Sequence, residues 1–200
     1  MAPTTPRLVA LGPGREKHLR VLFAVGASLA ALSLAACAPR PKEYRYPAWG
    51  FAVSFQTPPK VEDTPADGSR PHTLSTEVDR GPDDFVVFAF DAPPPTKPID
   101  DFTDGAAPIV ARSLGGEVGS KTYVATVQTT DQAMGREVQI TKDGRPFAVL
   151  RIYQAAGRLY EIAAKSQLGP TDPAAVAFLD SFILIPGASA PTPANAASAP

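Results

Sequence analysis

The chain contains a single cysteine, Cys37, among its 200 residues, and this scarcity excludes several kinds of structure. One thiol can form neither an internal disulfide nor a cluster of thiolate metal ligands. Stability must therefore come from a hydrophobic core, even in an oxidising compartment. Histidine is also scarce, since the sequence has only His18 and His72. So few imidazoles offer little material for acid–base catalysis or a zinc site.

The apolar segment Val21 to Ala36 is too short for a permanent membrane span. As a helix it would reach about 24 Å at roughly 1.5 Å per residue, less than the ~30 Å of a bilayer's hydrocarbon core. It carries no charge and follows Arg15, Lys17 and Arg20. A basic region before an apolar region is typical of a removable secretory signal.

The segment ends in Leu34-Ala35-Ala36-Cys37, which resembles the lipobox of bacterial lipoprotein signals. The resemblance implies cleavage before Cys37, thioether diacylation of its sulfur and usually a third acyl chain on the new amino terminus. A thiolate suits this attachment because it is a strong nucleophile, and two or three acyl chains hold a protein where one holds only weakly. The alternative is a buried apolar cysteine beside a signal that is cleaved elsewhere.

These features predict a bacterial envelope protein that is anchored to the membrane through acyl chains on Cys37. Ala38, rather than Asp, follows the cysteine, which favours the periplasmic face of the outer membrane. Without residues 1–36, the chain has 15 basic and 19 acidic residues, a net charge of −4. Nucleic acid is therefore not an expected partner.

Composition divides the chain into four parts. Residues 1–36 are the expected signal peptide, and residues 37–47, rich in proline and charge, are the expected lipid-anchored tether. Residues 186–200 consist almost wholly of Pro, Ala and Ser, which predicts a disordered tail. Residues 48–185 are then a single domain, long enough to form its own core.

Within this domain, seven segments show the alternation or the β-branched and aromatic composition of strands. They are residues 49–56, 71–78, 83–90, 121–129, 136–143, 145–154 and 157–166. Two helices are expected: residues 99–116, with Asp100 as N-cap, and residues 171–184, with Thr171 or Asp172 as N-cap and Pro173 in the first turn. The predicted fold class is α+β, an antiparallel sheet of about six to seven strands flanked by helices in the order βββαββββα.

Two turns set the expected strand register. Asp143-Gly144 is a strong hairpin signal, and residues 155–157, Ala-Ala-Gly, suit a three-residue loop. With these loops, and one bulge in the first hairpin, Glu137 and Glu161 would both lie opposite Arg151. Such a row is either a structural cross-strand ladder or a charge cluster that binds a ligand.

The strands and the terminal helix also carry a family resemblance. The segments WGFAVSFQTPP, GRPFAVLRIYQAAGRLYEIAAKS and AVAFLDSFIL resemble the fold shared by PsbP-like proteins of the photosynthetic oxygen-evolving complex and a Ran-binding nuclear import factor. The resemblance implies an α/β/α sandwich over about residues 48–185. Relatives bind proteins and assist assembly, and the resemblance implies no catalytic residue.

His72, Asp180 and Ser181 are the polar residues that a hydrolase could use. We expect His72 at an exposed edge of the sheet rather than in a catalytic role. Asp180, Ser181 and His72 could be imagined as a triad, but adjacent residues on a helix point about 100° apart, and no nucleophile-elbow motif surrounds Ser181.

Acidic and aromatic residues supply two further candidate sites. Asp100, Asp101 and Asp104 suggest a calcium loop, but their spacing fails that motif, and capping of a helix N-terminus explains them. Tyr44, Tyr46 and Trp49 form either an aromatic patch for a protein partner or, for Trp49, the rim of the core.

The sequence therefore predicts a non-enzymatic, lipid-anchored binding or assembly module of the cell envelope that has a protein partner. It contains no cofactor motif and no metal motif, so none is expected. The alternative is a lipoprotein that binds a small molecule or lipid in a pocket between helix and sheet, and a hydrolase is a minor third hypothesis.

Overall fold

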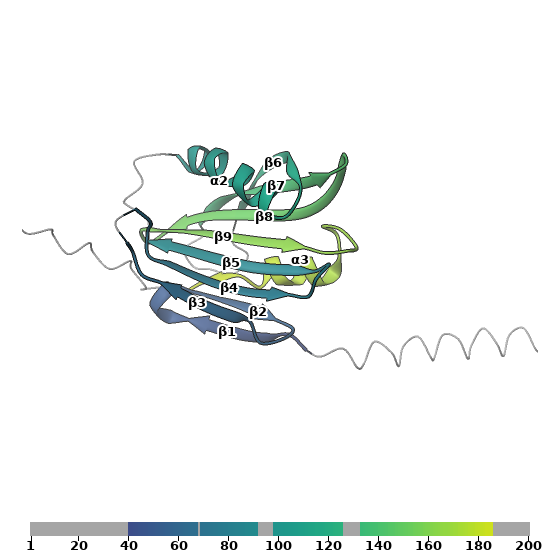
Figure 1. Ribbon diagram of the computed structural model, residues 1–200. Helices are drawn as coiled ribbons and strands as arrows, with labels where there is room; N and C mark the ends of the chain where they lie inside the picture. Colours follow the sequence, from purple (N-terminus) through teal and green to yellow (C-terminus); the bar gives the residue numbers. More distant parts are fainter. Residues whose placement is uncertain (1–39, 68, 92–97, 126–132, 186–200) are drawn as a thin grey trace, which may run out of the picture. The chain divides into compact units, whose positions relative to one another are not determined.

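The computed structural model describes residues 40–67, 69–91, 98–125 and 133–185. From Pro41 onward these residues belong to one compact unit. They form two antiparallel sheets, two α-helices and a short 3-10 helix (Figure 1). Within the described residues, neither helix is long and apolar enough to cross a membrane.

The larger sheet has seven strands in the order β3-β4-β5-β9-β8-β7-β6, with every neighbouring pair antiparallel. Its strands are β3 (Lys60–Thr64), β4 (Thr73–Asp79), β5 (Asp84–Asp91), β6 (Glu117–Ala125), β7 (Met134–Lys142), β8 (Arg145–Ala155) and β9 (Arg158–Lys165). The expected antiparallel sheet of an α+β protein is thus confirmed in this coarse form.

The smaller sheet has three strands in the order β1-β2-β10, which are β1 (Lys42–Tyr46), β2 (Phe51–Phe55) and β10 (Ile183–Leu184). Between β1 and β2 the 3-10 helix η2 (Pro47–Trp49) turns the chain, and Gly50 follows it with a positive φ of 74°. A positive φ is strained for residues that carry a Cβ, which explains glycine at this position.

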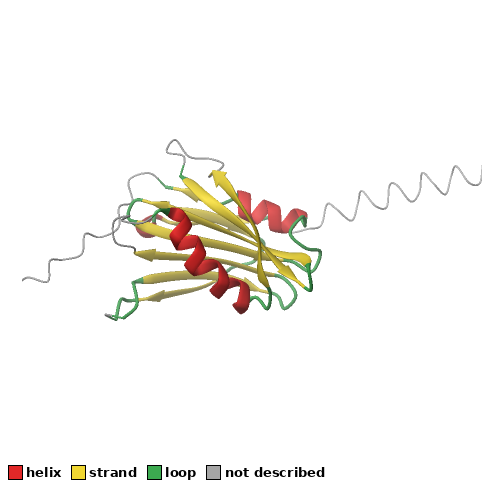
Figure 2. Cartoon of the chain, turned by 90° about the horizontal axis from the view of Figure 1, so that it is seen from above, coloured by secondary structure: helices red, strands yellow, loops and turns green. Residues whose placement is uncertain are grey.

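One core lies between the large sheet and helix α2 (Ile99–Ser113), which packs against β6, β7 and β8. Figure 2 shows this long helix lying across the strands. Its buried face consists of small residues, Thr103, Ala107 and Ala111, so the helix backbone can approach the sheet closely. The sheet contributes Val138, Ile140, Leu150 and Ile152 to this core.

A second core lies on the opposite face of the large sheet, beneath β2 and helix α3 (Pro173–Asp180). Strand β5 shows the two faces directly, because Val86 belongs to the first core and Val87 to the second. The second core is aromatic: Phe51, Phe55, Phe178 and Phe182 are all 5% exposed or less. A strand that is apolar on both faces is thus covered on both, as expected.

The expected order βββαββββα lacks three of the observed strands. Strand β1 lies within the predicted tether, yet its Tyr44 and Tyr46 pack toward Phe55 and Phe51. This correction moves the start of the folded part from Ala48 to about Lys42. Strand β3 is exposed along its whole length and strand β10 has two residues, so neither carries an apolar alternation.

Both helices begin or end differently from the prediction. Helix α2 has Pro98 rather than Asp100 at the N-cap, and Asp100 lies in its first turn. Helix α3 ends at Asp180 rather than continuing to residue 184, so Phe182 lies beyond the helix. Its start is as expected, because Asp172 accepts the N–H of Ala174 and Pro173 is the first helical residue.

Candidate functional site

A cluster of charged side chains lies at one end of the large sheet, where β3 ends and β4 begins. His72 precedes β4 and lies between two carboxylates: its Nε2 is 2.5 Å from Asp63 Oδ1, and its Nδ1 is 3.4 Å from Asp91 Oδ2. The Trp49 ring lies edge-on to the imidazole at 4.6 Å between centroids. The His72 side chain is 35% exposed, in line with the expected exposure, but it lies beside the edge strand β3 rather than on the edge itself.

The cluster continues to Arg158, which is only 3% exposed. Its Nε donates to Asp91 Oδ1 at 2.8 Å, and another guanidinium nitrogen donates to the carbonyl of Ala48, also at 2.8 Å. The Tyr160 hydroxyl donates to the carbonyl of Trp49 at 3.0 Å. These bonds attach helix η2 to the large sheet, so the cluster has a clear structural role.

The chemistry available to this cluster is that of an ion-pair network. A buried guanidinium needs a carboxylate beside it, and Asp91 supplies that charge while it also faces His72. Both ion-pair partners of His72 are carboxylates, so these contacts offer it no hydroxyl or thiol to deprotonate. Within the described ranges, no group of His, Cys, Asp and Glu side chains is arranged to hold a metal ion.

The predicted row of Glu137, Arg151 and Glu161 is correct for one pair only. Glu137 lies opposite Arg151, and Arg151 Nε donates to its carboxylate at 2.8 Å. Arg151 also donates to Asp180 Oδ1 at 2.7 Å, which joins β8 to the last residue of α3. Glu161 instead lies opposite Ile152, so its side chain is on the other face of the sheet.

The turn between β8 and β9 causes this difference. The predicted three-residue loop is wrong, because Ala155 pairs with Arg158 and only Ala156 and Gly157 form the turn. Both have a positive φ, 51° and 78°, as type I′ hairpin turns require. A shift of one residue moves every following side chain to the opposite face.

Glu161 thereby lies on an apolar part of the α2 face, with Phe88 opposite it on β5 and Ile152 opposite it on β8. Leu159 precedes it on the same face of β9. No hydrogen bond or ion pair of Glu161 occurs with the residues that the structure describes. Burial raises the pKa of its carboxyl to about 7.

Ser181 and Asp180 are used structurally. The Ser181 hydroxyl donates to the carbonyl of Phe178 at 2.7 Å and accepts the backbone N–H of Ser54 at 2.9 Å. Asp180 pairs with Arg151, and His72 pairs with Asp63 and Asp91. The three residues of the hypothetical triad therefore have separate partners.

The acidic residues of α2 pair with bases on neighbouring strands. Asp100 binds Arg136, and Asp104 binds Lys121. The hydrogen bond from Arg136 holds the pKa of Asp100 below its usual value. Arg136 also lies 3.1 Å from the centroid of the Tyr123 ring. These contacts attach the first turns of α2 to β6 and β7, and Asp101 lies exposed beside them.

The aromatic residues of the N-terminal segment face inward. Trp49 is 5% exposed, and the Arg158 guanidinium lies 5.0 Å from its ring centroid. Tyr46 stacks on Phe51 with 4.8 Å between centroids. Trp49 thus packs at the rim of the core, which is one of the two interpretations of the sequence, whereas Tyr44 and Tyr46 are partly buried.

A hollow lies between α3 and the sheets, lined by Pro41, Phe55, Val78, Arg80 and Phe178 among others. Its volume is about 30 Å³, which is room for a water molecule or two rather than a ligand. A wider hollow of about 310 Å³ lies at the turn between β7 and β8 and is open to solvent. Neither favours the alternative hypothesis of an enclosed ligand pocket.

The predicted lipidation site lies outside the described residues. The described residues also exclude the predicted signal peptide (residues 1–36), Cys37 itself and the predicted tail (residues 186–200). Their assignments stay predictions from the sequence.

Comparisons with known proteins found no matching family model and no matching curated protein. Among solved structures, the chain is similar to the solution structure of cyanobacterial PsbP (CyanoP) from Synechocystis sp. PCC 6803. The match has 12% sequence identity and a TM-score of 0.48, and it covers 73% of this chain and 93% of that chain. The structural neighbour is thus PsbP-like, the group that the sequence resembles.

Proposed function

We propose that this chain is a lipid-anchored, non-enzymatic binding or assembly module at the periplasmic face of the outer membrane. The anchor is Cys37 within Leu34-Ala35-Ala36-Cys37. The partner is another envelope protein, which docks on the large sheet beside α2.

The observation that carries this proposal is a set of four side chains that we call the aromatic shelf: Phe88, Phe90, Leu159 and Glu161. They lie on adjacent strands β5 and β9, on the face of the sheet that carries α2. All four are only partly buried, whereas α2 packs against β6, β7 and β8. Phe88 and Phe90 stack with 6.1 Å between ring centroids. Partly exposed aromatic residues are enriched in protein interfaces.

The charge of the shelf indicates the chemistry of the partner. Glu161 has no basic partner within the described residues, and Glu77 on the adjacent β4 strand faces the same side. We infer a partner segment that inserts an apolar side chain between Phe88 and Leu159 and places a Lys or Arg near Glu161. Such a cation would shift the Glu161 carboxyl toward its charged form and form a charge-assisted hydrogen bond.

The non-enzymatic part of the proposal is supported by the partners of Ser181 and His72, the residues that a hydrolase would need. The Ser181 hydroxyl both donates and accepts a hydrogen bond with the backbone, and His72 lies between two carboxylates. A nucleophile requires a general base within hydrogen-bond reach, and Ser181 has backbone partners instead.

Site-specific photo-crosslinking in the native host tests the docking surface. A photoreactive amino acid at Phe90 of the full-length protein should crosslink to one envelope protein. The same amino acid at Val61, which is 48% exposed on the edge strand β3, is the control and should not. Glu161→Gln should weaken the Phe90 crosslink about tenfold, because the charge-assisted bond is lost.

Equal crosslinking from Phe90 and Val61 would show that the shelf has no special role. A Phe90 crosslink that Glu161→Gln leaves unchanged would exclude the proposed basic contact and leave only apolar docking. Glu62→Gln, on the exposed β3 strand, is the matched control for loss of a carboxylate.

A further inference from the structure

We propose that one end of the domain, which we call the anchor end, lies against the phosphate headgroups of the bilayer. The anchor end consists of Pro41, the β4–β5 turn with Arg80, and the loop before α3 with Leu168. This inference rests on the proposed lipid anchor, and it adds which surface of the folded domain faces the membrane.

The first observation is where the chain enters the domain. Pro41 lines the small hollow together with Arg80, Ala174 and Phe178, so the tether joins the fold beside the β4–β5 turn and the start of α3. Cys37 stands four positions before Pro41. Four residues span at most about 14 Å even when fully extended. An acylated Cys37 would therefore hold Pro41 within about 14 Å of the bilayer interface, a distance that the headgroups partly fill.

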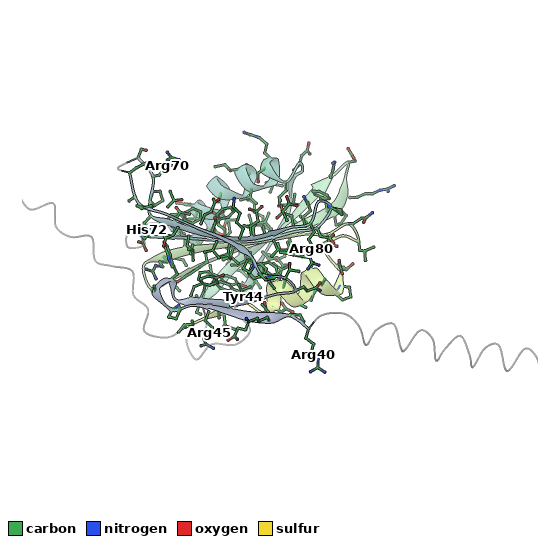
Figure 3. The ribbon with its side chains drawn as sticks, turned by 60° about the horizontal axis from the view of Figure 1, so that its bottom comes forward. Arg40, Tyr44, Arg45, Arg70, His72 and Arg80 are labelled. Carbon is green, nitrogen blue, oxygen red and sulfur yellow. The ribbon has the colours of Figure 1, made fainter. Side chains whose placement is uncertain are left out.

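The two ends of the domain differ in their distance from Pro41, because the strands between them are long. Strand β5 runs from Asp84, next to the β4–β5 turn, to Asp91, which faces His72. At about 3.3 Å per residue this strand is more than 20 Å long. Figure 3 shows Arg80 at one end of the domain and Arg70 and His72 at the other. A short tether keeps the first end near the headgroups, whereas the second end reaches them only if the strands lie flat along the bilayer.

The second observation is the most exposed large apolar side chain among the described residues. Leu168, in the loop before α3, is 78% exposed. The loop is held in place, because Gln167 N–H donates to Asp83 Oδ1 at 2.9 Å and Leu168 N–H donates to Ser166 Oγ at 3.2 Å. Leu168 therefore projects from an ordered loop that is bonded to the β4–β5 turn. An apolar side chain in this position can insert among headgroups.

The third observation concerns charge. Arg80 is exposed, and its guanidinium donates to two neutral groups, Gln56 Oε1 at 3.3 Å and Thr57 Oγ1 at 3.0 Å. The nearby carboxylates of Asp79 and Asp83 accept backbone N–H groups instead. The guanidinium thus forms no ion pair with the residues that the structure describes, and it can bind a phosphate with two parallel hydrogen bonds. An exposed leucine in a loop that is bonded to the turn carrying this arginine fits a phospholipid surface.

The test uses the full-length acylated protein, reconstituted into vesicles of phosphatidylethanolamine and phosphatidylglycerol that carry a headgroup-level quencher. Acylation occupies the thiol of Cys37, so an introduced cysteine is the only free thiol. Leu168→Cys and, as the control, Arg70→Cys are each labelled with a polarity-sensitive dye. We expect a blue shift and at least twofold quenching for the label at residue 168, and little change at residue 70.

Equal quenching at both positions, or stronger quenching at residue 70, would overturn the inference while leaving the lipid anchor intact. Co-flotation of the protein with the vesicles is measured in the same samples. Failure of the protein from its native host to float with the vesicles would contradict the lipid anchor. It would also contradict the proposed orientation, which depends on that anchor.

Discussion

Replacing Phe182 by alanine is expected to lower the free energy of unfolding by about 3–5 kcal/mol. Phe182 is 2% exposed and lies at the centre of an aromatic group. Its ring stacks on Tyr153 and on Phe51, each at 5.7 Å between centroids, and contacts Tyr160 at 5.6 Å. Truncation would leave a cavity among rigid rings that cannot collapse to fill it. Urea denaturation of the wild type and of Phe182→Ala measures this change.

Ser181→Ala is the matched control, one residue away. It removes the acceptor of the Ser54 N–H, and we expect a smaller cost of about 1–2 kcal/mol. Equal destabilisation by both substitutions would contradict the assigned packing. A Ser181→Ala variant of unchanged stability that loses a measurable activity would overturn the structural role of Ser181.

The stability of the protein is expected to fall between about pH 5 and pH 8 because of Glu161. Burial raises the pKa of this carboxyl from 4.5 to about 7, so the folded state retains a proton that the unfolded state has lost. The stabilising contribution of protonated Glu161 is fully present below pH 4.5 and is lost as the pH rises through 7. The difference between the folded and unfolded pKa values sets the loss in the free energy of unfolding at up to about 3 kcal/mol.

Glu161→Gln should remove this dependence, because glutamine cannot ionise. The variant should be more stable than the wild type at pH 8 by as much as about 3 kcal/mol, and the difference should shrink toward pH 5. Urea melts at a series of pH values measure both curves, with Glu62→Gln as an exposed control. A wild type and a Glu161→Gln variant with parallel curves would show that Glu161 ionises normally.

Strands β2, β4, β5, β7, β8 and β9 could be predicted from the sequence because their side chains alternate or are apolar on both faces. Strand β6 begins at Glu117, four residues before the expected segment 121–129, and residues 126–129 lie outside the described ranges. The turn at Asp143-Gly144 was also predictable, since both residues adopt the positive φ that such a turn requires, 51° and 72°. Strand β3 could not be predicted, because all five of its residues are exposed and it contains Lys60, Glu62 and Asp63. Charged side chains on an edge strand prevent pairing with other chains, and they also hide the strand from an apolar pattern.

The location of Glu161 depended on a single residue of loop length. In the segment Ala155-Ala156-Gly157, only glycine accepts a positive φ without cost, which favoured a three-residue loop. The structure instead has Ala156 at a positive φ of 51°. We attribute this to the pairing along β8 and β9, which outweighs the local cost of about 1–2 kcal/mol. Tertiary pairing of this kind cannot be read from three small residues.

The cluster around His72 could not be predicted from the sequence, for a different reason. Its members, Trp49, Asp63, His72, Asp91 and Arg158, come from five separate segments of the chain. One signal was present: Arg158 occupies an inward position of β9, two residues before the buried Tyr160. A charged residue in phase with buried apolar residues indicates a buried ion pair, although the partner has to come from the structure.

The most direct test of the lipid anchor, on which the proposed role and orientation depend, is metabolic labelling with a clickable fatty acid in the native host. We predict that the wild-type protein is labelled and fractionates with the outer membrane, whereas Cys37→Ala is unlabelled. Equal labelling of the two proteins, or an unlabelled wild type, would contradict acylation of Cys37 and with it the assignment of the chain as an envelope lipoprotein.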